Sequence, residues 1–196
     1  MVRKKIKKSI RRIAYLFCEG EKTEKYYFEG LRKDYSNIFS IKIICSQDRN
    51  PKNMISYAKE YLKRTSYDDE KDIVFCIFDK DDNTNIELNS AKKLAIKYHY
   101  NLIFSNPSFE FWFLCHFGEF EYAYDKDGLN YKLNTFLKKY DKTDLFLYEK
   151  TKEKIKKAII HAKKIEQKHI SNNIEIISRE SNPSTNIYKI IEILSK

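Results

Sequence analysis

The sequence has little of what builds linkers, metal cages or membrane spans. Its 196 residues include four glycines and three prolines, which leaves little room for flexible linkers or low-complexity segments. The four cysteines lie far apart and form no CxxC pair, so a zinc cage is not expected. No apolar run approaches the roughly 18 to 20 residues that cross a bilayer. These absences predict one domain, or one domain with an appendage, and no membrane association.

Several catalytic motifs are also missing. The chain contains no GxGxxG, no Walker A motif, no GxSxG and no HExxH. Dinucleotide binding of the Rossmann type, P-loop chemistry, serine-hydrolase chemistry and zincin-type proteolysis are therefore not expected. Each cysteine lies in an apolar run, which is typical of buried free thiols. With no secretory signal pattern in the sequence, this leads us to expect a cytoplasmic protein.

What the chain does have is positive charge. Its net charge is +10, which favours a polyanionic partner, although a lysine-rich coding bias would give the same figure. Lysines concentrate in residues 150–168, and a basic arm covers residues 3–12. Both segments are compatible with an ordinary solvated surface or with a surface that follows a phosphate backbone.

Short apolar runs alternate with amphipathic segments over the first 117 residues. Strands are predicted over 13–18, 38–45, 73–78 and 101–105. Helices are predicted from Thr23 or Glu24, from Pro51, and over 88–98 and 109–117. This alternation predicts an α/β fold with a mostly parallel sheet of about four strands flanked by helices.

The character of the chain changes after residue 117, so we divide it into a core (1–117) and a basic, mainly helical C-terminal extension (118–196) packed on the core. Helices are expected over 129–140, 149–168 and 187–194. A further strand is possible over 174–177, and Asn182-Pro-Ser-Thr185 has the composition of a turn and helix cap.

Acidic residues follow two of the predicted strands. Glu19 comes directly after the first strand, and Asp79 and Asp81 follow the third. Open parallel sheets carry their chemistry outside the carboxyl ends of the strands, so these side chains are expected to share one crevice. Two carboxylates at i and i+2 can bind one Mg²⁺. The alternatives are an exposed loop glutamate and a polar turn.

A third acidic position follows the fourth strand. Glu110 falls in the first turn of a predicted helix, with Ser108 as a natural N-cap, and negative charge there suits the helix dipole. It is equally a candidate ligand of a second metal. Asp79 and Asp81 also fit a haloacid-dehalogenase phosphohydrolase, but that class usually carries its DxD on the first strand. Here the pair follows the third, so we rank it low.

Four motifs, in order, resemble the RloB family, which is associated with restriction and abortive phage infection loci. They are Cys18-Glu-Gly-Glu-Lys-Thr-Glu24 with Tyr27-Phe28, Phe78-Asp-Lys-Asp-Asp82, Ser105-Asn-Pro-Ser-Phe-Glu-Phe-Trp112 and Asn182-Pro-Ser-Thr185. The resemblance covers nearly the whole chain. It implies a Toprim-like fold, the catalytic module of primases, topoisomerases and related nucleases.

The resemblance also implies roles for residues. Glu19, Asp79 and Asp81 match the metal ligands of the Toprim site, while Glu24 and Glu110 match those that complete a site for two Mg²⁺ or Mn²⁺ ions. The nuclease branch adds a downstream lysine, for which both Lys142 and Lys150 qualify; we take Lys142 as the candidate. The family context implies a separately encoded ATPase partner.

We therefore expect a metal-dependent nuclease, acting on DNA or RNA in antiphage defence, with Glu19, Asp79, Asp81, Glu110 and Lys142 as catalytic residues. The main alternative is a non-catalytic, nucleic-acid-binding subunit that regulates the ATPase. A small phosphotransferase or phosphatase is a third reading. The sequence does not distinguish DNA from RNA and leaves a homo-oligomer open.

Overall fold

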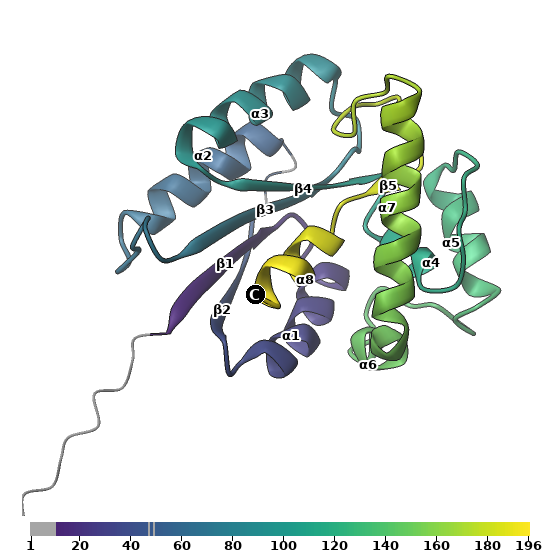
Figure 1. Ribbon diagram of the computed structural model, residues 1–196, viewed down its shortest axis with the longest axis horizontal. Coiled ribbons are helices and arrows are strands. Elements are labelled where there is room, and N and C mark those ends of the chain that lie inside the picture. The colour runs from purple at the N-terminus through teal and green to yellow at the C-terminus, as the bar shows by residue number, and fades with distance from the viewer. Residues whose placement is uncertain (1–10, 47, 49) are drawn as a thin grey trace, which may run out of the picture.

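A computed structural model describes residues 11–46, 48 and 50–196 of the chain. Its centre is a five-stranded sheet in the order β2-β1-β3-β4-β5 (Figure 1). The strands are β1 (Arg12–Cys18), β2 (Phe39–Cys45), β3 (Ile73–Asp79), β4 (Asn101–Asn106) and β5 (Ser184–Thr185). The first four run parallel, and β5 pairs antiparallel with β4. The predicted α/β class is confirmed, and the arrangement is compatible with a Toprim-like fold.

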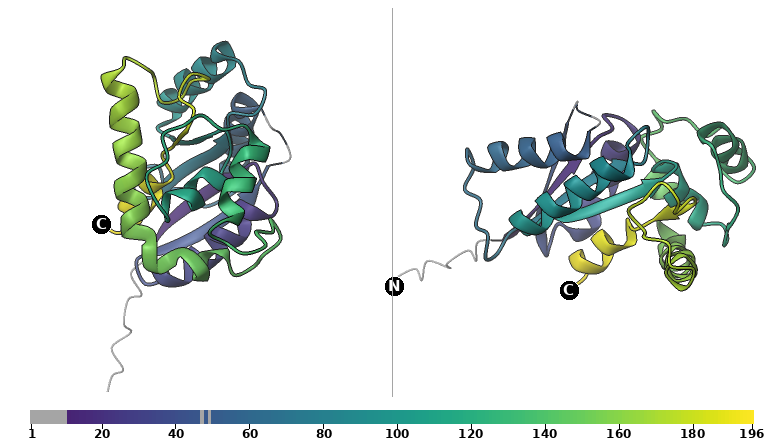
Figure 2. Two further views of the ribbon diagram at one scale, coloured as in Figure 1. Left: turned by 90° about the vertical axis from the view of Figure 1, so that its right-hand side faces the viewer. Right: turned by 90° about the horizontal axis from the view of Figure 1, so that it is seen from above.

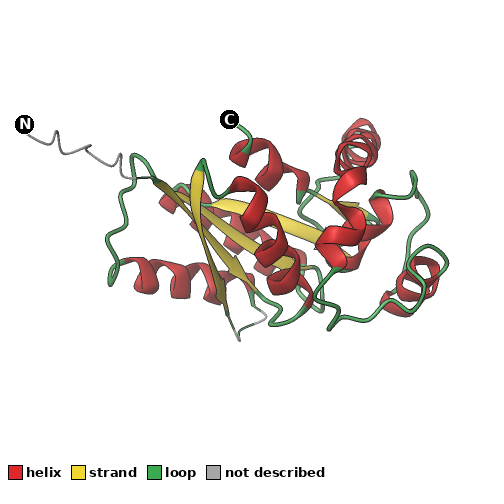
Figure 3. Cartoon of the chain, turned by 90° about the horizontal axis from the view of Figure 1, so that it is seen from below, coloured by secondary structure: helices red, strands yellow, loops and turns green. Residues whose placement is uncertain are grey.

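Helices flank this sheet on both faces (Figure 3). In chain order they are α1 (Thr23–Tyr35), α2 (Pro51–Leu62), α3 (Asn85–Tyr98), α4 (Glu110–Cys115), α5 (Lys126–Asn134), α6 (Leu147–Thr151), α7 (Ile155–Ser171) and α8 (Tyr188–Leu194). Local chemistry fixes several of their starts. Asn50 caps α2 ahead of Pro51, and Thr84 forms a capping box with Glu87 at the start of α3.

Alternate residues of the strands supply two separate cores. Tyr15, Phe17 and Cys76 pack under α2 and α3 on one face of the sheet. Leu16 and Phe75 point to the other face, where they pack against α1, α4, α7 and α8. Figure 2 shows the helices in layers on either side of the sheet. Continuous apolar runs are what strands buried on both faces require.

The C-terminal part of the chain belongs to the same core and sheet. Leu129, Ala158 and Ile190 lie in one hydrophobic cluster with Leu16 and Phe28. Strand β5 extends the sheet beyond β4. Residues after 117 therefore pack directly on the first 117, and α7 and α8 cover the face that α1 also covers.

Three predicted elements were wrong. Residues 174–177 form no strand. The fifth strand is β5, in the segment predicted to be a turn, and its two residues are too few to show a periodic pattern. The helix predicted over 129–140 ends at Asn134, whose side chain accepts a hydrogen bond from the backbone N–H of Tyr140 at 2.8 Å. Lys139, with φ of 58°, adopts the left-handed conformation, which does not continue a helix.

The helix predicted over 149–168 is divided. A 3₁₀ turn (Lys152–Lys154) separates α6 from α7. Thr151 Oγ1 bonds to the carbonyl of Leu147 at 2.7 Å and lies 3.2 Å from that of Tyr148. Such bonds from a threonine to its own helix compete with the regular pattern and bend it. The boundary thus has a local cause that apolar spacing does not reveal.

The expectation of buried free thiols is met for three of the four cysteines, and several other side chains are buried as well. The four cysteines are free; Cys45 is half-buried and the others are fully buried. Phe109, Phe111 and Trp112 are core residues. His116 is buried as well, with Nδ1 2.9 Å from the carbonyl of Trp112. Within the described ranges, no helix is both long enough and apolar enough to cross a membrane.

Candidate functional site

The carboxyl ends of three neighbouring strands meet at one edge of the sheet. Cys18 of β1 pairs with Ile77 of β3, and Asp79 pairs with Ser105 of β4, so all three strands end side by side. A pocket of ≈ 570 Å³ opens there. Its lining includes the five predicted carboxylates and two lysines: Glu19, Glu24, Asp79, Asp81, Glu110, Lys126 and Lys142. The fold thus brings together side chains that lie up to 123 residues apart.

Glu19 spans the gap between β1 and β3. Its Oε2 accepts a hydrogen bond from the backbone N–H of Asp79 at 3.3 Å, and its own N–H donates to the carbonyl of Ile77 at 3.2 Å. Burial, with the nearby negative charge of Asp81, raises the pKa of Glu19 to about 8. Because ionising Glu19 is unfavourable in this environment, a cation that binds beside its carboxylate is stabilising.

Glu24 lies in the first turn of α1 and folds back on the loop after β1. Its Oε1 accepts a hydrogen bond from the Gly20 N–H at 3.2 Å. A Cβ at position 20 would meet Glu24 Oε2 at 1.8 Å, so this approach requires glycine. Burial raises the pKa of Glu24, and repulsion from Glu110 adds to the effect. The five-residue spacing from Glu19 is therefore no obstacle to sharing one pocket.

The two aspartates of the DxD pair differ in their surroundings. Burial raises the pKa of Asp79 well above its ordinary value, and the charges of Glu24, Glu110 and Glu19 raise it further. Asp81 has φ of 38°, a left-handed conformation that aspartate tolerates better than most residues. Its carboxylate forms an ion pair with Lys126.

Glu110 is held by donors from two other segments. Ser108 Oγ donates to Oε2 at 2.6 Å, Tyr140 Oη donates to Oε1 at 2.9 Å, and Lys142 Nζ lies 3.4 Å from Oε1. Burial alone would raise the pKa of Glu110, but Ser108, Lys142 and Tyr140 together hold it below its ordinary value. The expected N-cap role of Ser108 was wrong: Phe109 is the cap residue, and the hydroxyl binds Glu110 instead.

The structure distinguishes the two candidate lysines by position. Lys142 lines the pocket, whereas Lys150 forms an ion pair with Asp144 outside it. Lys126 and Tyr140 also contact the carboxylates, and neither was predicted from the sequence. Lys126 is the first residue of α5, and Tyr140 lies in the loop after that helix; one lysine among many carries no local signal. Only the tertiary fold reveals them.

The basic C-terminal segment is largely neutralised by the protein itself. Of the eight lysines in residues 150–168, five form ion pairs with carboxylates: Lys150, Lys152, Lys163, Lys164 and Lys168. This favours the solvated-surface reading for most of that segment. For the basic arm at residues 3–12, positions 3–10 lie outside the described residues.

The donor chemistry of the pocket fits a divalent cation. Mg²⁺ and Mn²⁺ prefer carboxylate oxygens, and six carboxylate groups line the pocket, the five predicted ones and Glu21. These side chains do not, however, converge as metal ligands. Within the part of the chain that the structure describes, no three Asp, Glu, His or Cys side chains are placed to hold an ion. Lys126 instead neutralises Asp81, and Lys142 lies against Glu110. A cation binding between the aspartates would displace Lys126.

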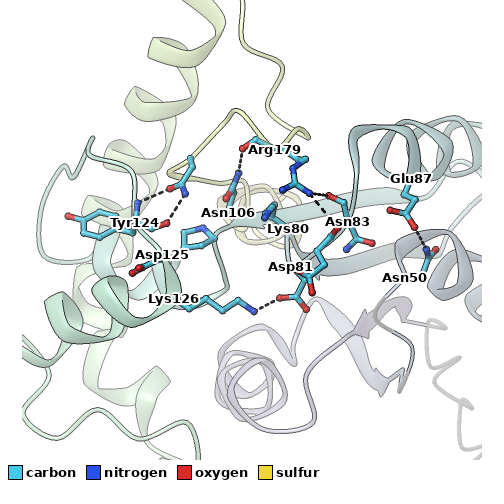
Figure 4. Close-up of a pocket in the computed structure, with 13 residues that line it drawn as sticks. Asn50, Lys80, Asp81, Asn83, Glu87, Asn106, Tyr124, Asp125, Lys126 and Arg179 are labelled. Carbon is cyan, nitrogen blue, oxygen red and sulfur yellow. Dashed lines mark hydrogen bonds and ion pairs between the residues drawn. The ribbon is translucent and has the colours of Figure 1, made fainter.

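A second pocket of ≈ 710 Å³ adjoins the first (Figure 4). Asp81 and Lys126 line both pockets. The rest of its lining comes from the loop after β3, the end of β4 with Pro107, the starts of α2 and α3, the residues just before α5, and the C-terminal segment that carries Arg179 and Asn182. The candidate site is thus one half of a larger polar depression.

A comparison with known proteins identifies a family. A family model described as RloB-like protein matches residues 14–194, nearly the whole chain. No curated protein and no solved structure matches. The matched range includes every residue of the carboxylate pocket.

Proposed function

Because this chain belongs to the RloB-like family, we propose that it is a Mg²⁺- or Mn²⁺-dependent nuclease that hydrolyses phosphodiester bonds of DNA or RNA. The observation that carries the proposal is the convergence of six carboxylates, the five predicted ones and Glu21, with three lysines on one pocket at adjacent strand ends. The net charge of +10 supports a polyanionic substrate. Carboxylates among cations suit chemistry on a phosphate ester.

Each residue has a part in this proposal. Glu19, Asp79 and Asp81 would hold one ion, with Glu24 and Glu110 on or near a second. Bound ions would supply an activated water and stabilise charge on the leaving oxygen. Lys142, beside Glu110, is positioned to neutralise charge on the phosphate, and Tyr140 and Ser108 orient Glu110.

The biological setting we propose follows from the family resemblance alone. It is antiphage defence inside the bacterial cell, with a separately encoded ATPase as partner. A nuclease that harms its own host would need control by such a partner, which senses infection and releases the activity.

The alternative is a nucleic-acid-binding subunit that regulates the ATPase without turnover. The pairing of Asp81 with Lys126 and of Glu110 with Lys142 favours it, because these two carboxylates already have a cation partner without a metal. The two functions are separated by incubating the protein with labelled single- and double-stranded DNA and RNA, including tRNA, in Mg²⁺, Mn²⁺ or EDTA. Metal-dependent cleavage supports the nuclease; metal-independent binding without cleavage, with and without the ATPase, supports the subunit.

Replacing Lys126 with methionine is expected to tighten Mn²⁺ binding about tenfold, which corresponds to about 1.4 kcal/mol. The change removes a cation that competes with the ion for Asp81. Lys138→Met is the matched control, since Lys138 is exposed and makes no ion pair within the described residues. Calorimetric Mn²⁺ titration of both variants measures the effect. Equal affinities in the two variants would show that Lys126 does not compete.

A further inference from the structure

The second pocket has the size and position of a binding site. Its volume of ≈ 710 Å³ lies within the roughly 300–1,000 Å³ of small-molecule sites. Because Asp81 and Lys126 line both pockets, the two pockets adjoin at this ion pair. A nucleic-acid strand bound at the carboxylates must extend beyond them, and this pocket is the depression next to them.

The carboxylates of this pocket are mostly engaged by the protein. Glu87 accepts hydrogen bonds from the Thr84 N–H at 2.8 Å and from Asn50 Nδ2 at 3.3 Å. Asp125 caps α5 and accepts from the Gly128 N–H at 2.7 Å. Asp81 is paired with a lysine, as described above. Asp82 is exposed. Among the described residues, only Asp81 is neutralised by a cation; the donors to Glu87 and Asp125 are uncharged and hold these carboxylates in place without removing their charge.

Two cations in the same pocket form no ion pair with any residue that the structure describes. Lys80 is half-buried, and its ammonium group makes no hydrogen bond within the described residues either. Arg179 uses Nη1 to donate to the carbonyls of Asp82 at 3.5 Å and Asn83 at 3.3 Å. Both side chains line the pocket, and Figure 4 draws them in it. An ammonium and a guanidinium that share a pocket and pair with no carboxylate form a site for an anion, above all a phosphate.

A polar acceptor completes the pocket. Asn106 Nδ2 donates to the carbonyls of Ser178 and Arg179, both at 3.2 Å, while its buried Oδ1 has no hydrogen-bond partner within the described residues. Buried acceptors normally find a donor. The amino group of a base or a ribose hydroxyl can supply one.

We propose that this pocket binds the nucleotide next to the cleaved bond, with its phosphate between Lys80 and Arg179. The inference rests on the proposed function and specifies its substrate. A nucleotide can enter the pocket only if it is not stacked in a duplex, so the substrate is single-stranded or locally unpaired nucleic acid. Free nucleotides carry the same phosphate chemistry, so the test separates the two sources.

The test measures binding of labelled twelve-nucleotide single strands by fluorescence anisotropy, in EDTA and over a series of salt concentrations. Lys80→Met is expected to weaken binding about tenfold and to reduce the slope of log affinity against log salt by about 0.7, the value for one phosphate contact to a single strand. Lys93→Met is the matched control: Lys93 is exposed on α3 and makes no ion pair within the described residues. It is expected to bind like the wild type.

Three outcomes would overturn the proposal. The first is equal binding by Lys80→Met and Lys93→Met. The second is a loss of folding in Lys80→Met together with unchanged binding by Arg179→Lys, which keeps the charge but not the guanidinium fork. The third is displacement of the strand by AMP or UMP at equal concentration, which would assign the pocket to free nucleotides. Failure of the nuclease proposal is seen separately, as absence of metal-dependent cleavage, and leaves these EDTA results intact.

Discussion

Asp79→Asn is expected to lower metal-dependent cleavage at least about a thousandfold, because the substitution removes a charged ligand at the centre of the site. The same change should raise the free energy of unfolding of the metal-free protein, on the order of 1 kcal/mol. Burial and the charges of Glu24, Glu110 and Glu19 all disfavour an ionised Asp79. A residue that costs stability yet carries activity has the signature of a functional site.

Asp69→Asn is the matched control for this substitution. Asp69 is exposed in the loop that precedes β3, at the opposite end of the strand from Asp79. Removing its charge should change neither cleavage nor the free energy of unfolding measurably. If Asp79→Asn cleaves as fast as Asp69→Asn, the carboxylate pocket is not the catalytic site. If it unfolds more easily, Asp79 supports the fold instead of opposing it.

His116→Asn is expected to abolish a pH dependence of stability that the wild type shows between about pH 6.5 and 4. Burial lowers the pKa of His116 to about 4, while an unfolded histidine titrates near 6.5. Between these values the unfolded chain binds a proton that the folded chain does not, so stability falls as pH falls through this window. The loss amounts to about 3 kcal/mol at pH 4, and none of it is present above pH 6.5.

Asparagine is chosen because its side-chain amide can replace Nδ1 as a donor to the carbonyl of Trp112. The smaller side chain lowers stability by a constant amount at every pH, so the informative quantity is the change in the wild-type-minus-variant difference. His99→Asn is the control: His99 is exposed and has φ of 57°, a conformation that asparagine accepts. Urea unfolding of the wild type and both variants from pH 4 to 8 measures this difference in the free energy of unfolding. A constant difference for His116→Asn would mean that the buried ring does not resist protonation.

The sheet and the carboxylates attached to it could be predicted because their signals are local. Apolar runs such as 13–18 and 73–78 specify strands buried on both faces, and parallel strands end at the same edge. A residue that follows a strand directly, as Glu19 does, is therefore placed by the strand itself. Glu110 is placed almost as well, since three residues separate it from the end of β4.

The donors that surround these carboxylates could not be predicted, because they depend on long-range packing. Lys126 reaches Asp81 across 45 residues, and Tyr140 reaches Glu110 across 30. Both lie after α4, where the apolar pattern is weak and the helix predicted over 129–140 was too long. Strand β5 was missed for a related reason: it exists only through its pairing with Ser105 and Asn106.

The most direct test of the metal site is a calorimetric titration of Mn²⁺ into the full-length wild type, Asp79→Asn and Asp69→Asn. We expect the wild type and Asp69→Asn to bind Mn²⁺ equally, with close to two ions per chain. Asp79→Asn is expected to lose affinity by more than the roughly 10- to 100-fold that follows removal of a residue outside the ligand set. Equal Mn²⁺ binding by all three proteins, or none by the wild type, would contradict the assignment of these strand ends to a metal site.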